Sequence, residues 1–234
     1  MTATHRAPLR AVLFDAGNTL LFLDHARMAA AVGAALGMRL TGPGLAACTG
    51  AAARSMETAR ANDRERAAAY LETLFLEAGV PAARLGEVRE CLSRLHGERH
   101  LWSATAPDTH DALRRLRDAG LRLGVVSNSD GRVEEALEAA GLRPYFRVVV
   151  DSALAGVEKP DPAIFRAALE VLGIPAAEAL YVGDLYDVDV VGARAAGMTA
   201  VLLAPPGTTP PAACATAPSL AALADDLLKE RFAS

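Results

Sequence analysis

Residues that can do chemistry follow four apolar runs of this 234-residue chain, close to where each run ends. The first is Asp15, which comes directly after the run 11–14 and is followed, after Ala16, by the Gly-Asn turn signal at residues 17 and 18. A carboxylate at the rim of an apolar core is costly unless a metal ion, a hydrogen-bond donor or a substrate meets it. The others, in chain order, are Ser127, Asn128, Lys159, Asp184, Asp187 and Asp189.

Together these residue types indicate phosphoryl transfer. Carboxylates that converge on one place repel one another unless a hard divalent cation lies between them. Lys159 is one of two lysines in a chain with 22 arginines, and with a helix N-terminus near Ser129 it can hold an anion. A cation, an anion site and a nucleophilic carboxylate are the parts of a phosphoryl-transfer site. Simpler interpretations also exist: an Asx turn at Asp15, a strand-end cap at Ser127, a solvated charge at Lys159, and a helix cap at Asp184 and Asp189.

The elements that must position these residues alternate between strand and helix. Apolar runs predict strands over Ala11–Phe14, Leu121–Ser127, Phe146–Val150, Leu180–Gly183 and Ala200–Leu203. Amphipathic segments predict helices over Pro107–Ala119, Arg132–Ala140, Pro162–Gly173 and Val188–Ala196, and a last helix after Ser219, with a loop over Pro205–Pro218. Such alternation predicts an α/β fold with a doubly wound parallel sheet, in which the carboxyl ends of the strands meet at one edge.

The segment after the first strand has a different composition. Residues 24–100 contain no run of β-branched residues and are rich in Ala, Leu, Arg and Glu, which favours helix. Breaks at Thr41–Gly44 and Gly79–Pro81 divide the segment into three or four helices, and its length is far beyond that of one crossover. We therefore expect residues 1–22 and 101–234 to form an α/β core, and residues 23–100 to form an inserted helical domain.

The composition excludes several classes of protein. A net charge of −4 gives no reason to expect binding to nucleic acid, and no apolar run reaches the length of a membrane span. The three cysteines, Cys48, Cys91 and Cys214, have neither metal-ligand spacing nor the pattern of a disulfide framework, which favours a reducing compartment. We expect a cytoplasmic protein without nucleic-acid or membrane partners; the sequence leaves its oligomeric state open.

In four motifs the chain resembles the haloacid dehalogenase-like hydrolase superfamily: residues 11–21, 125–128, 159–161 and 181–193. The helical insertion after the first motif resembles the cap of the first type in that family. The resemblance implies that Asp15 is the nucleophile, which forms an aspartyl-phosphate from a small phosphorylated metabolite, and that it also binds Mg²⁺. It implies further Mg²⁺ ligands in the backbone carbonyl of Gly17 and in Asp184 and Asp189, support of the nucleophile by Thr19, phosphate binding by Ser127 and the backbone amide of Asn128, and charge neutralisation by Lys159.

One position departs from the phosphatases of this family. They carry a second aspartate two residues after the nucleophile as general acid and base, and this chain has Gly17 there. General acid–base help is worth roughly 10²–10⁴-fold in rate, so poor leaving groups should suffer most. A flap could bring Asp24 or His25 into the role of general acid and base.

Two functions other than a magnesium-dependent phosphatase also remain open. One is a metal-free haloacid dehalogenase, which would not need Asp184, and the other is a weakly active or inactive regulatory protein that binds phosphate.

Overall fold

In the computed structural model, which describes residues 8–52, 63–204 and 214–232, the chain divides into two compact units. One unit consists of Met1–Phe22 and Ala104–Ser234, and the other consists of Leu23–Ser103. The sequence places the second boundary at residues 100 and 101, three residues earlier than the structure does. Across the described parts of the chain, no helix combines the length and apolar character needed to cross a membrane.

The first unit is built on a six-stranded sheet in which every neighbouring pair is parallel. Its spatial order is β5-β4-β1-β6-β7-β8. This order, with the first strand of the unit in the middle, is that of a doubly wound fold and confirms the predicted fold class. The strands are β1 (Ala11–Phe14), β4 (Arg122–Ser127), β5 (Val148–Asp151), β6 (Ala179–Gly183), β7 (Thr199–Leu203) and β8 (Ala215–Ala217).

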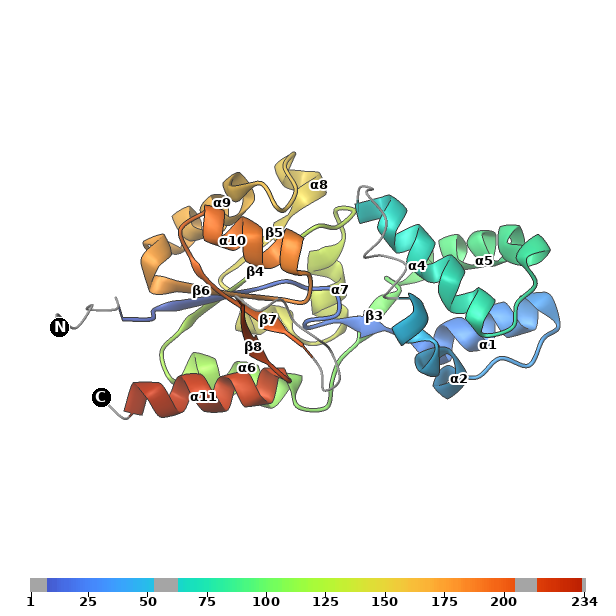
Figure 1. The fold of residues 1–234 in the computed structure, drawn as a ribbon, viewed down its shortest axis with the longest axis horizontal. Helices are drawn as coiled ribbons and strands as arrows, with labels where there is room; N and C mark the ends of the chain where they lie inside the picture. The colour runs from blue at the N-terminus through green and yellow to red at the C-terminus, as the bar shows by residue number, and fades with distance from the viewer. Residues whose placement is uncertain (1–7, 53–62, 205–213, 233–234) are drawn as a thin grey trace. The chain divides into compact units, whose positions relative to one another are not determined.

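Helices cover both faces of this sheet (Figure 1). On one face lie α9 (Pro162–Leu172) and α10 (Val191–Ala195), and on the other lie α6 (Thr109–Asp118) and α11 (Leu220–Phe232). The capping residues explain where α9 begins and ends. Asp161 accepts a hydrogen bond from the backbone N–H of Ala163, Pro162 occupies the first turn, and Gly173 adopts the left-handed conformation at the C-terminus. Two short helices, α7 (Val133–Ala139) and α8 (Ser152–Ala155), follow β4 and β5.

The structure corrects the sequence at three places. Strand β8 lies in the predicted loop Pro205–Pro218, of which residues 205–213 lie outside the described residues. The predicted helix Val188–Ala196 instead begins with a π-helical turn, η4 (Tyr186–Val190), before α10. Short strands β2 (Phe22–Leu23) and β3 (Trp102–Ala104) pair where the chain passes from one unit to the other, although neither shows a strand pattern in sequence.

The second unit is helical, as its composition predicts. Its helices include α1 (His25–Leu36), α2 (Gly42–Ala47), α4 (Asp63–Glu77) and α5 (Leu85–Glu98). They enclose a core of their own, in which Val32, Leu74 and Phe75 are fully buried. The unit thus has enough buried apolar surface to be a separate body inserted after β1.

Candidate active site

The register of the sheet brings the predicted site residues to one edge. Phe14, the last residue of β1, lies level with Val125 of β4 and Val182 of β6. The residues that follow these positions therefore leave the sheet side by side, among them Asp15, Ser127 and Asp184. The strand order reverses at β1, and open α/β sheets bind their ligands at such a point, outside the carboxyl ends of the strands.

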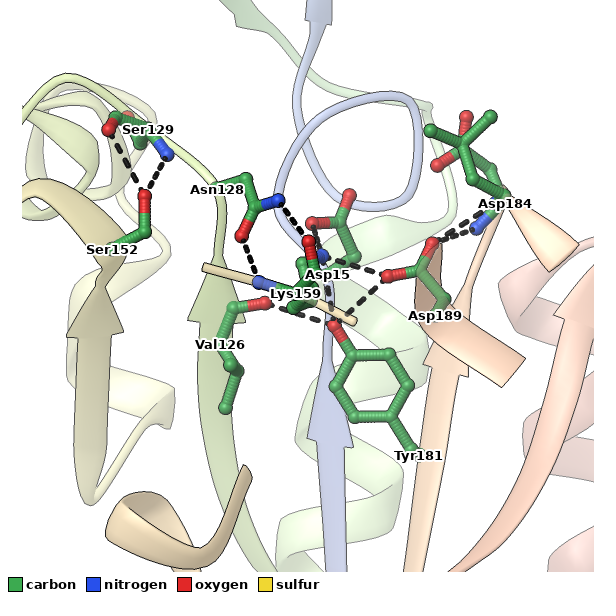
Figure 2. A network of polar contacts seen from close by, with 10 residues as sticks. Asp15, Val126, Asn128, Ser129, Ser152, Lys159, Tyr181, Asp184 and Asp189 are labelled. Carbon is green, nitrogen blue, oxygen red and sulfur yellow. Dashed lines mark hydrogen bonds and ion pairs between the residues drawn. The ribbon is translucent and has the colours of Figure 1, made fainter. Parts of the chain in front are cut away.

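Lys159 joins the ends of these strands through its ammonium group (Figure 2). Its Nζ donates to Oδ1 of Asp15 at 2.6 Å, to Oδ1 of Asp189 at 2.7 Å and to the hydroxyl of Tyr181 at 3.1 Å. The lysine side chain is 3% exposed and that of Asp15 is 9% exposed. A buried ammonium therefore uses its three donors on groups from three separate segments, which fixes its position beside Asp15.

Asp189 holds both the lysine and the loop after β6. Its Oδ2 accepts hydrogen bonds from the backbone N–H groups of Asp184 at 3.1 Å and Leu185 at 2.9 Å, while its Oδ1 meets Lys159. Gly183 permits this close approach, since a Cβ there would lie 2.3 Å from Cγ of Asp189. Both carboxylate oxygens thus already accept bonds from protein groups, a task that the sequence did not predict. The ligand role expected for Asp189 stays a prediction.

The electrostatics of the cluster follow from burial and crowding. Burial raises the pKa of Asp15 to about 6, against the opposing effect of the Lys159 ammonium. Burial also raises the pKa of Asp184 well above its usual range, and the charges of Asp15 and Asp189 raise it further. For Lys159, burial alone would lower the pKa, but the two neighbouring carboxylates outweigh it and hold the pKa well above its ordinary value. Lys159 is therefore a permanent cation in a site with excess negative charge.

Asn128 places the lysine through its backbone. The side-chain Oδ1 of Asn128 accepts from the N–H of Lys159 at 2.7 Å, and its Nδ2 donates to the carbonyl of Lys159 at 3.0 Å. On the other side of this loop, Gly192 of α10 leaves room for Pro160, whose Cα would lie 2.9 Å from a Cβ at position 192. The segment that carries Lys159 is therefore held between the end of β4 and helix α10.

Three of the remaining predicted residues lie at the same edge. Ser127 is buried as the last residue of β4. Gly17 lies in the turn after β1, where the carbonyl of Ala16 accepts from the N–H groups of Leu20 and Leu21. Thr19 is 2% exposed, and its Oγ1 has no hydrogen-bond partner among the described residues. Asp187 is exposed and lies in none of the contacts given above.

The donor set fits a hard divalent cation. Asp15 and Asp184 offer carboxylate oxygens at neighbouring strand ends, and their mutual repulsion would be relieved by a positive ion. The orphaned hydroxyl of Thr19 in the same turn as Asp15 indicates that a ligand group completes the hydrogen bonding there. Oxygen ligands of this kind suit Mg²⁺ better than softer metals.

Two residues at this edge escaped the sequence analysis as site components. Tyr181 lies inside β6, where its hydroxyl donates to the carbonyl of Val126 at 2.9 Å as well as meeting Lys159. Asp151 ends β5 and accepts backbone hydrogen bonds from the loop after β4. A tyrosine in a strand that is otherwise apolar is a usable signal, because a buried hydroxyl needs a partner.

Tyr181→Phe is expected to lower the free energy of unfolding by about 1–3 kcal/mol, because it removes hydrogen bonds to a buried ammonium and a backbone carbonyl while keeping the ring. Urea unfolding measures the change. Tyr145→Phe is the matched control, since the Tyr145 hydroxyl makes an exposed contact with His110 at 3.4 Å. An equal loss in the two variants would refute the anchoring role of Tyr181.

Comparisons with known proteins identify the family to which the chain belongs. The sequence model of a family described as haloacid dehalogenase-like hydrolase matches residues 9–197. Haloacid dehalogenase-like hydrolase domain-containing protein 3 of Bos taurus is 38% identical over 143 residues, which are 61% of the chain and 57% of that protein. The glyceraldehyde 3-phosphate phosphatase of Methanopyrus kandleri is 39% identical over 107 residues, 45% of the chain and 46% of that protein. The chain spans about half the length of the curated relatives it matches.

Solved structures share the fold. A HAD phosphatase from Thermococcus onnurineus superposes with a TM-score of 0.60 at 26% identity, over 94% of the chain and 98% of that protein. A 2-haloacid dehalogenase from Pseudomonas syringae pv. Tomato DC3000 superposes with a TM-score of 0.59 at 24% identity, over 95% and 99%. The fold alone therefore does not separate phosphate hydrolysis from dehalogenation, and the side chains must decide.

Proposed function

Because the chain belongs to the haloacid dehalogenase-like hydrolase family, we propose that it is a magnesium-dependent phosphatase of a small phosphorylated metabolite. In this proposal the carboxylate of Asp15 attacks phosphorus and forms an aspartyl-phosphate while the bond from phosphorus to the leaving-group oxygen breaks. Water then hydrolyses the aspartyl-phosphate, which regenerates the carboxylate and releases inorganic phosphate. The phosphatase names among its relatives support the phosphoryl substrate.

The observation that carries the proposal is the buried contact of Lys159 with Asp15. A permanent ammonium 2.6 Å from Oδ1 of the nucleophile orients that carboxylate and offsets the negative charge that an approaching phosphoryl group brings. Tyr181, Asp189 and the Asn128 side chain hold this ammonium in place, so little rearrangement is needed during the reaction.

Asp15 and Asp184 would hold Mg²⁺, with the Gly17 carbonyl and Asp189 as the further ligands expected from the family resemblance. When bound, the ion supplies Lewis acidity and makes the crowded negative charge tolerable. Ser127 and the backbone amide of Asn128 would bind the phosphate at the end of β4, and Thr19 would support Asp15 from the turn that follows β1. These roles are supported because the assigned groups lie at or after the carboxyl ends of β1, β4 and β6, the same edge of the sheet at which Lys159 makes its contacts.

Two features set limits on the substrate. Gly17 cannot transfer a proton, so a leaving group that departs without one, such as an aryl or acyl phosphate, should react best. We further propose that the unit Leu23–Ser103 is a cap that selects the substrate.

The free thiols of Cys48, Cys91 and Cys214 fit a reducing compartment such as the cytoplasm.

The acidic groups favour this proposal over the first of its two rivals. A metal-free dehalogenase expels halide without a proton or a cation, and the crowding of Asp184 against Asp15 would then have no purpose. A regulatory protein that binds phosphate without turnover is the second rival, and Gly17 is its best support. Each rival predicts a result that the phosphatase does not: the first predicts halide release, and the second predicts phosphate binding without turnover.

Removal of Mg²⁺ is expected to reduce hydrolysis of an activated aryl phosphate by about 100-fold or more, because the ion offsets charge that the site cannot otherwise carry. The measurement is steady-state turnover in excess EDTA, followed by titration with Mg²⁺ to full recovery. Halide release from a 2-haloacid in the presence of EDTA would establish the dehalogenase instead. Saturable binding of inorganic phosphate without any turnover would establish the regulatory protein.

A further inference from the structure

Asp151 is a buried carboxylate at the end of β5 for which the proposed reaction has no task. It is 4% exposed, and its oxygens accept only backbone N–H groups among the contacts found. Oδ1 accepts from Ala153 at 3.0 Å and from Gly131 at 3.0 Å, and Oδ2 accepts from Gly131 at 3.1 Å and Val133 at 3.2 Å. A single carboxylate thus caps α8, which follows it, and also binds a segment about twenty residues earlier in the chain.

That segment is the β4 loop, defined as residues 128–132, which joins β4 to α7. The neighbouring Ser152 binds it as well, since its Oγ accepts from the N–H of Ser129 at 3.1 Å and donates to the carbonyl of Ser129 at 3.3 Å (Figure 2). Arg132, the N-terminal cap residue of α7, makes no side-chain capping bond, so Asp151 supplies that acceptor from another strand. Asp151 and Ser152 therefore bind the chain at three alternate residues, which are Ser129 and Gly131 in the β4 loop and Val133 at the start of α7.

The β4 loop is the segment on which the proposed phosphate site depends. It begins directly after Ser127, and its first residue, Asn128, clasps the backbone of Lys159 through two hydrogen bonds. Gly131 has a φ of 95°. Because glycine adopts positive and negative φ about equally readily, this residue gives the loop no intrinsic preference for its path. The path is set instead by the hydrogen bonds to Asp151 of β5 and Ser152 of α8, and these also fix the position of Asn128.

We propose that Asp151 is a positioning residue for phosphate binding, which acts by fixing the β4 loop so that Ser127 and the Asn128 amide meet the phosphate in a preformed arrangement. The inference rests on the proposed function, and adds a residue that touches neither substrate nor metal. A carboxylate that accepts from the N–H groups of Gly131 and Val133 orders the loop more strongly than a neutral acceptor can, because hydrogen bonds to a charged group are the stronger ones. Without the Asp151 carboxylate, the loop must become ordered when phosphate binds. The free-energy cost of this ordering then lowers the affinity for phosphate.

Asp151→Ala is expected to raise both KM for an aryl phosphate and the inhibition constant of inorganic phosphate by about tenfold. The Mg²⁺ concentration for half-maximal rate should change less than about twofold, since Asp15 and Asp184 are not on the β4 loop. Asp151→Asn should give intermediate values, because its amide keeps one acceptor oxygen but presents a donor to the other N–H groups. Hydrogen exchange of the amides of Ser129, Gly131 and Val133 should accelerate in the same order.

Ser219→Ala is the control for stability alone. The Ser219 hydroxyl caps α11 in the same unit by accepting from Ala222 at 3.2 Å, away from the β4 loop. Each variant is assayed at a temperature where it is fully folded. Unchanged phosphate inhibition and KM in Asp151→Ala, or an equal rise in Ser219→Ala, would overturn the proposal while wild-type hydrolysis stands. Failure of the wild-type protein to hydrolyse or bind phosphate would instead refute the proposed function, and unaltered loop exchange would refute the positioning role independently.

Discussion

Asp15→Asn is expected to reduce turnover of an aryl phosphate by about 10⁴-fold or more, with the fold intact. An amide cannot form the aspartyl-phosphate, and loss of a nucleophile costs an enzyme of this kind most of its rate. The ammonium of Lys159 keeps its bonds to Asp189 and Tyr181 in this variant, so the buried charge is not left alone. The measurements are steady-state rates and, for the wild-type protein, mass analysis of acid-quenched enzyme for a phosphoryl group on the peptide that contains Asp15.

A matched control separates chemistry from a general change of charge. Asp118→Asn makes the same replacement at the exposed end of α6, where the carboxylate pairs with Arg117. It should leave turnover within about twofold. Activity of Asp15→Asn equal to that of the wild type, or a phosphoryl group found on another peptide, would contradict the assignment of the nucleophile and the mechanism built on it.

The core fold was predictable because its signals are local. Uninterrupted apolar runs identify β1 and β6 as buried parallel strands, and the sequence Asp161-Pro162 with Gly173 marks both ends of α9. Strand β8 was missed because its sequence, Ala215-Thr216-Ala217, has little strand propensity and is exposed at two of three positions. Its place in the sheet is decided by pairing with β7, which no local window contains.

Part of the candidate site was also predictable from local sequence, and part was not. Asp15, Ser127 and Asp184 could be placed together because each ends a strand of one parallel sheet. The second contacts of Asp189 depend on the π-helical turn η4, which carries its side chain back to the N–H groups of Asp184 and Leu185. The clasp of Asn128 on Lys159 joins residues 31 apart in sequence. These contacts of Asp189 and Asn128 depend on tertiary packing, so the local sequence does not predict them.

The candidates to replace the missing acid lie in the helical unit. Asp24 caps α1 by accepting from the N–H of Arg27 at 3.0 Å and forms an ion pair with Arg99 at 2.9 Å. Burial lowers the pKa of His25, which favours its neutral form. The carboxylate of Asp24 is thus already engaged within its own unit. An aspartate restored at position 17 therefore tests the missing-acid argument directly.

Gly17→Asp is expected to raise turnover of an alkyl phosphate by about tenfold or more, within the 10²–10⁴-fold that general acid–base catalysis can supply. Gly17 is not among the glycines with a positive φ, so an aspartate at this position brings no backbone strain of that kind. An alkoxide leaves poorly without a proton, whereas an aryl oxide leaves well, so the ratio of alkyl to aryl phosphate turnover is the measured quantity. That ratio should rise in the variant because only the alkyl reaction lacks its proton.

Gly17→Asn is the control for size and polarity, since its amide matches the carboxyl group in shape but does not transfer a proton at neutral pH. The carbonyl of residue 17 is present in both variants, so any metal contact through it is kept. A rise of the ratio in Gly17→Asp alone assigns the gain to proton transfer. Equal ratios in the two variants, or a lower ratio in Gly17→Asp, would show that the rate on poor leaving groups is limited elsewhere, and Gly17 would then carry no catalytic meaning.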